Sequence, residues 1–66
     1  MEIIVKTNKY TAQSLQQALN PNGGIFCVVL GGDHPGEYVI VTQDALQARL
    51  ITGMLDHLGL DWRISA

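Results

Sequence analysis

The segment from Gly31 to Glu37, GGDHPGE, holds the densest group of side chains that could carry chemistry. Asp33, His34 and Glu37 are residue types that ligate metal ions or exchange protons, and the glycine amides could form an anion-binding nest. The competing interpretation is a solvated turn, because Gly, Asp and Pro are ordinary turn residues. The sequence favours the turn, since no G-x-G-x-x-G or P-loop spacing surrounds the glycine pair.

A second group of polar residues precedes the first predicted helix. Lys6, Lys9 and Tyr10 could bind a phosphate or nucleotide through two ammonium groups, an aromatic ring and the N–H groups of the helix start. The alternative, which we favour, is a polar connection whose lysines extend into solvent. Together with the three side chains named above, these residues form the candidate ligand- or partner-binding set.

No arrangement of residues predicts a catalytic centre or a metal site. Cys27 is the only cysteine, so zinc-ligand spacing and an intrachain disulfide are excluded. It lies inside the apolar run IFCVVL and is expected to be buried and unreactive. His57 and Trp62 are interpreted as a solvated helix residue and a core residue. We therefore expect no cofactor, no metal, no catalytic residue and no enzymatic activity.

Four segments predict the β-strands that would position these groups. Residues 2–7, 25–30 and 37–42 are short and rich in β-branched side chains, and residues 60–65 alternate between apolar and polar types. The connection between the second and third strands, residues 31–36, predicts a hairpin loop longer than a tight two-residue turn.

Two further segments predict helices. Thr11 is the expected N-cap of a helix over residues 12–19, and Asp44 is that of a longer helix ending at Gly59. The apolar residues of the longer helix fall within about half of its circumference and should face the core. They are Leu46, Leu50, Ile51, Met54, Leu55 and Leu58.

This order of elements, β-α-β-β-α-β, is the split βαβ or ferredoxin-like pattern. We expect an α+β fold in which two helices cover one face of a four-stranded antiparallel sheet with strand order 4-1-3-2. With 66 residues, the chain is interpreted as a single domain, 1–66. In this topology the connections over 7–11, 31–36 and 57–61 meet at one end of the sheet. The two candidate polar groups would then lie together.

The predicted strands are apolar on both faces, although the helices can cover only one. A second apolar set should be exposed in a monomer, and an exposed apolar face beside a free edge strand usually marks an interface. We therefore expect a homodimer or higher homo-oligomer. The alternative is a curled sheet that shields part of the second face. The candidate oligomer interface consists of Ile4, Phe26, Val28, Leu30, Tyr38 and Ile40.

The charge pattern narrows the choice of partner. Six acidic and four basic residues give a net charge of −2, and no basic run is present, so direct nucleic-acid binding is not expected. No apolar stretch reaches the ~20 residues of a membrane span, and the N-terminus lacks the pattern of a signal peptide. We expect a soluble cytoplasmic protein whose partner is another protein. A small anionic ligand is the alternative.

Three functions follow from these features, and the first is favoured. It is a small non-enzymatic interaction protein that occupies a partner's surface. In size, single-domain organisation and mild acidity, the chain resembles the small inhibitors that phages and mobile elements encode against host defence systems, such as anti-CRISPR proteins. The resemblance implies inhibition by surface blocking and assigns no site residue.

The other two functions are alternatives. One is an oligomeric binder or sponge for a nucleotide or another anion. The least favoured is a minimal enzyme that uses His34 with Asp33 or Glu37.

Overall fold

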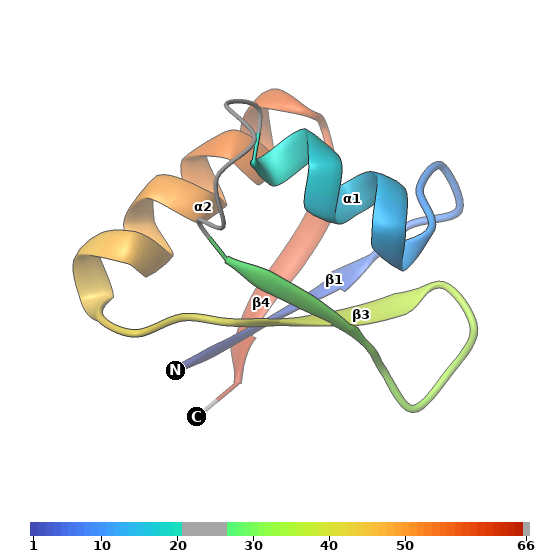
Figure 1. Ribbon diagram of the computed structural model, residues 1–66, viewed down its shortest axis with the longest axis horizontal. Helices are drawn as coiled ribbons and strands as arrows, with labels where there is room; N and C mark the ends of the chain where they lie inside the picture. Colours follow the sequence, from blue (N-terminus) through green and yellow to red (C-terminus); the bar gives the residue numbers. More distant parts are fainter. Residues whose placement is uncertain (21–26, 66) are drawn as a thin grey trace.

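Both helices lie on one face of a single antiparallel sheet in the computed structural model, which describes residues 1–20 and 27–65 (Figure 1). The elements are β1 (Glu2–Lys6), α1 (Ala12–Leu19), β2 (Val28–Gly31), β3 (Glu37–Val41), α2 (Ala45–His57) and β4 (Asp61–Ser65). The sheet order is β2-β3-β1-β4, and the three neighbouring pairs are antiparallel. The expected α+β, ferredoxin-like fold is confirmed, including the order 4-1-3-2 read from the other edge.

The central strand β1 fixes which side chains enter the core. Ile3 lies opposite Ile40 of β3, and Ile3 and Val5 are fully buried. Since side chains alternate between the two faces of a strand, Ile4 lies on the face without helices. The buried apolar residues of the described chain are Ile3, Val5, Leu15, Leu19, Cys27, Val29, Ile40, Ala48, Ile51, Leu55 and Leu60.

Helix α1 begins where the sequence predicts, because Thr11 and Ser14 form a reciprocal capping box. The Thr11 hydroxyl accepts a hydrogen bond from the Ser14 N–H at 3.1 Å, and the Ser14 hydroxyl accepts one from the Thr11 N–H at 2.8 Å. A helix of only 8 residues is marginal in isolation. The burial of Leu15 and Leu19 against the sheet therefore supplies much of its stability.

Hydrogen bonds between residues close in the sequence also define both ends of helix α2. The Asp44 carboxylate accepts a hydrogen bond from the Gln47 N–H at 2.8 Å, as expected of an N-cap. At the other end, the Leu60 N–H donates to the Leu55 carbonyl at 3.0 Å, and the Gly59 N–H donates to the Asp56 carbonyl at 3.0 Å. With Gly59 at φ +73°, these bonds form a Schellman motif that turns the chain into β4.

The expected apolar face of α2 is partly wrong. Leu46 and Leu50 are 67% and 51% exposed, while Ala48, Ile51 and Leu55 form the buried stripe. A helix lying on one flat sheet buries only a stripe of its surface, narrower than the half-circumference over which the apolar residues are spread. Small Ala48 occupies a place in that stripe, and the two leucines are turned away from it.

The second strand is shorter than expected at its start and longer at its end. It was predicted over 25–30, but β2 spans Val28–Gly31, and residues 25 and 26 lie outside the described residues. Val28 lies opposite Val41, the last residue of β3, so β2 begins where its ladder partner ends. Apolar composition alone does not reveal this limit.

Two alanine substitutions at glycines of the α2 region should shift stability in opposite directions. Gly59→Ala should destabilise the fold by about 1–2 kcal/mol, because an L residue is strained at positive φ. Gly53→Ala is the matched control within α2, at an exposed site where a Cβ would meet nothing within 4 Å. It should stabilise by about 0.5–1 kcal/mol.

Urea denaturation and thermal melting measure both effects, with about 4–8 °C expected per kcal/mol in a domain of this size. Shifts of the same sign in the two variants would contradict this account of the helix end.

Candidate functional site

Three connections meet at one end of the sheet and enclose an open cleft of about 570 Å³, which we call the loop-end cleft. Its lining comes from residues 6–9, 34–37 and 59–61. These segments belong to the three connections that the topology was predicted to bring together. The volume lies within the range of ~300–1,000 Å³ that is usual for small-molecule sites.

A backbone contact holds two of these connections against each other. The Thr7 N–H donates to the Gly36 carbonyl at 2.8 Å, continuing the β1–β3 ladder beyond the strands. Gly36 has φ +79°, and a Cβ at this position would lie 3.2 Å from the Thr7 carbonyl oxygen and 3.3 Å from Asn8 Oδ1. A side chain there would be both strained and crowded, so glycine is required where the two loops touch.

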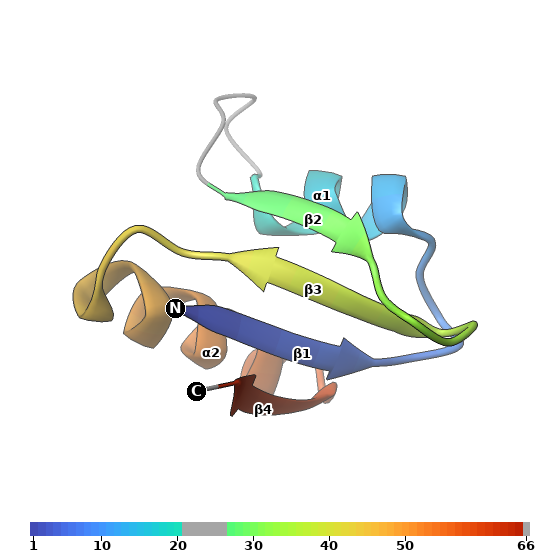
Figure 2. The same cartoon turned by 90° about the horizontal axis from the view of Figure 1, so that it is seen from below.

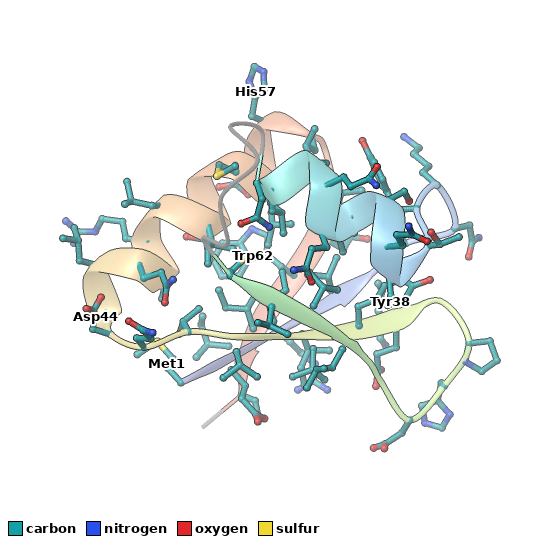
Figure 3. The ribbon with its side chains drawn as sticks, in the orientation of Figure 1. Met1, Tyr38, Asp44, His57 and Trp62 are labelled. Atoms are coloured by element: carbon teal, nitrogen blue, oxygen red, sulfur yellow. The ribbon has the colours of Figure 1, made fainter. Side chains whose placement is uncertain are left out.

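The cleft gathers four of the six candidate binding residues. They are Lys6, Lys9, His34 and Glu37. Asp33 lies exposed in the same hairpin connection but outside the lining. Tyr10 is half-buried and packs against the core, and its carbonyl accepts a hydrogen bond from the Tyr38 hydroxyl at 3.0 Å. The phenol of Tyr38 thus ties the start of α1 to β3 on the helix side of the sheet (Figure 3).

Charges of both signs line the loop-end cleft. Lys6 lies opposite Glu37 on β3 and Asp61 on β4, so acidic residues occupy the neighbouring positions on both adjacent strands. Lys9 lies in the connection after β1, away from these pairings. The cleft therefore offers a mixture of donors and acceptors rather than a concentrated positive field.

The described side chains make few contacts that would fix a metal or orient His34 in this cleft. The side chain of His34 makes no hydrogen bond with any of them, and none of their His, Cys, Asp and Glu side chains form a group of three or more that could hold a metal. The expected burial of Cys27 is confirmed. Burial raises the pKa of its thiol, and a hydrogen bond with Asn20 offsets part of the effect. Cys27 is therefore a poor nucleophile at neutral pH.

Figure 2 shows the face of the sheet that lies away from both helices, which we call the open face. The strand register places a continuous group of apolar residues on it. Val28, Leu30 and Val41 are 44%, 50% and 43% exposed, and Ile4 and Val39 are half-buried beside them. The register places Val28 opposite Val41, and sets Leu30, Val39 and Ile4 in one row across three strands. We call these five residues the apolar band.

The structure corrects two members of the candidate interface. Ile40 is fully buried and lies opposite Val29, so the pleat of β3 turns Ile40 and Tyr38 toward the helices. Their assignment to the face of Val28 and Leu30 is wrong, while Ile4, Val28 and Leu30 do share the open face. The sixth member, Phe26, lies outside the described residues.

Val39 and Val41 are the members of the apolar band that the sequence did not select. Because β3 is apolar on both faces, only its pairing with β1 and β2 could identify them.

The edge of the sheet at β2 is covered by side chains from the α1 region. The Val29 N–H donates to Gln16 Oε1 at 2.9 Å, and the Cys27 N–H donates to Asn20 Oδ1 at 3.2 Å. Asn20 Nδ2 lies 3.4 Å from the Cys27 carbonyl oxygen and also donates to the Gln16 carbonyl at 2.6 Å. These amides take the place of a further strand, so β2 is a poor template for strand pairing along this part of its edge.

Gln16→Ala should uncover the Val29 amide. The loss of one acceptor should cost about 0.5–1.5 kcal/mol and accelerate hydrogen exchange at Val29 by up to about tenfold. Gln17→Ala, at an exposed position of the same helix, is the matched control for the change in helix propensity. NMR-detected amide exchange measures both variants. Equal rates at Val29 in the two variants would show that the Gln16 contact does not protect this edge.

Comparison with known proteins gives no match to a family model, to a curated protein or to a solved structure. Neither helix of the described chain has the length and apolar character needed to cross a bilayer. The features of the described chain that bear on its function are the loop-end cleft, the open face and the sheet edges.

Proposed function

We propose that the protein acts as a small non-enzymatic interaction protein, which binds a protein partner through the apolar band of its open face. The observation that carries the proposal is the exposure of Val28, Leu30 and Val41, side by side on a face that neither α1 nor α2 covers. Exposed apolar patches of this kind mark interaction surfaces, because a monomer gains nothing from presenting them to water.

The surroundings of the apolar band support the same function. Along β1, Ile4 lies between Glu2 and Lys6 on the open face, and Arg63 of β4 lies opposite Ile4. An apolar centre beside charged residues is the usual anatomy of a protein–protein interface. In such a site, the apolar side chains supply most of the affinity, and the charges select the partner and its orientation.

Occupying a partner's surface is a complete mechanism for an inhibitor of this size. It needs no reaction and no bound cofactor, only a partner with a complementary apolar patch. Inhibition of a host defence protein, the role that the resemblance to small phage-encoded inhibitors implies, would proceed in this way. The apolar band supports this mode of action, and affinity capture, described next, identifies the partner.

Leu30→Asp should abolish capture of the partner, because it would bury an unpaired carboxylate at the centre of the interface. Leu50→Asp is the matched control, since Leu50 on α2 is 51% exposed and Leu30 is 50% exposed. Tagged wild-type and variant proteins are compared by affinity capture from host lysate with quantitative mass spectrometry.

We expect one protein to be retained by the wild type and Leu50→Asp and reduced more than tenfold with Leu30→Asp. If all three proteins retained the same partner, or if both folded variants lost it, binding through the apolar band would be refuted.

A second candidate function is supported by the loop-end cleft. Lys6, Lys9 and His34 converge there in a volume suited to a small molecule. The carboxylates of Glu37 and Asp61, which also line the cleft, favour a ligand with hydrogen-bond donors as well as an anionic group. A nucleotide has both. This function corresponds to the expected binder or sponge and does not use the apolar band.

Thermal melting with added AMP, and separately with inorganic pyrophosphate, tests this second function. A ligand present at 100 times its Kd should stabilise the fold by about 2.7 kcal/mol, which is a clear rise in Tm. Lys9→Ala should remove the rise, while Arg49→Ala, a charge removed from an exposed site on α2, should keep it. An unchanged Tm with both compounds would exclude the cleft as a site for these anions.

A further inference from the structure

The backbone groups at the two edges of the sheet differ in their hydrogen-bond partners, and this difference points to self-association. At the β2 edge, Gln16 and Asn20 accept hydrogen bonds from the N–H groups of Val29 and Cys27. At the other edge, no described residue outside the sheet forms a hydrogen bond to the backbone of Trp62 or Ile64. No proline or lysine interrupts β4 either, although such residues commonly protect free edges.

The direction of the β4 backbone groups follows from the ladder between β1 and β3. The Thr42 N–H donates to the Met1 carbonyl at 3.0 Å, and the Thr7 N–H donates to the Gly36 carbonyl at 2.8 Å. Odd-numbered residues of β1 therefore bond to β3, and even-numbered residues bond to β4, because antiparallel partners alternate in this way.

The partners of Glu2, Ile4 and Lys6 on β4 are its odd-numbered residues, from Asp61 to Ser65. It follows that Trp62 and Ile64 direct their N–H and C=O groups away from β1, toward the free edge. The β4 edge is therefore open to a further antiparallel strand.

We propose that the free edge of β4 pairs antiparallel with β4 of a second copy of the chain, centred on Trp62, so that Asp61 of each copy lies opposite Arg63 of the other. The two sheets then form one continuous sheet across a two-fold axis. The proposal goes beyond the proposed function, because it uses a different surface. It also gives the assembled dimer two apolar bands, one on each copy.

Charge complementarity indicates both that the added strand is β4 of a second copy and which residues lie opposite each other. With the two-fold axis at Trp62, two pairs of opposite charges form between Asp61 and Arg63 of the partner subunit, and the Trp62 backbones exchange two hydrogen bonds. An axis at Arg63 would place the two arginines opposite each other, and an axis at Ile64 would place Arg63 opposite the uncharged Ser65 of the partner subunit. Opposite charges across strands are favourable and like charges are unfavourable, so the strand is self-complementary in this single register.

Size and exposure also favour a second copy. Ile64 is 45% exposed at the uncovered edge, and pairing of the strands would cover part of its side chain. A chain of 66 residues has a small core, for which association is a common source of further stability.

Charge reversal provides a test with an internal rescue. The wild-type protein at high micromolar concentration should sediment at twice the chain mass of 7.2 kDa. Arg63→Asp and Asp61→Arg should each raise the dimer Kd by about tenfold or more, because each places like charges across the interface. Mixing the two variants should restore a dimer, since every facing pair in the heterodimer has opposite charges.

Other variants and a measurement on the wild type keep the test decisive. Leu30→Asp should remain dimeric, which separates this interface from the apolar band. If either charge variant unfolds by circular dichroism, amide exchange of wild-type Trp62 and Ile64 replaces it, and their protection should rise with protein concentration. A monomeric wild type, dimeric single variants, folded variants that fail to associate on mixing, or concentration-independent exchange would each overturn the proposal.

Discussion

The hydrogen-bonded register between β1 and β3 is the constraint on which the rest of the structure depends. By pairing Ile3 with Ile40, it turns the odd-numbered side chains of β1 toward the helices. It also commits the backbone groups of the same residues to β3, which leaves the even-numbered residues to bond with β4. A shift of one residue would exchange the buried and open faces. The β1–β3 register therefore determines the core, the open face and the direction of the free backbone groups of β4.

Features that depend on neighbouring residues could be predicted from the sequence. Thr11, Asp44 and Gly59 mark helix ends through contacts within one turn, and each has the predicted role. The order of strands and helices could be predicted for a similar reason, because each element has its own periodicity. The meeting of three connections at one end of the sheet could be predicted from topology, since strand order decides which connections lie together.

Features that depend on distant residues could not be predicted. β3 is apolar on both faces, so nothing within it distinguishes Ile40, which is buried, from Val41, which is exposed. Leu50 is likewise indistinguishable by type from Leu55, and only the docking of α2 on the sheet separates them. The same limit applies to the site: Tyr10 was grouped with the lysines by proximity in the chain, but packing draws it toward the core.

The source of the cover over the β2 edge has a consequence for how the chain reaches its native state. The amides of Gln16 and Asn20 belong to α1 and the residue after it, so the strand has no such cover until the helix has docked. A helix of 8 residues does not persist in water without that docking. During synthesis, β2 is thus an unguarded apolar strand, and α1 docking competes with intermolecular strand pairing. Soluble yield should consequently depend on chain concentration and temperature during expression more than on the stability of the folded state.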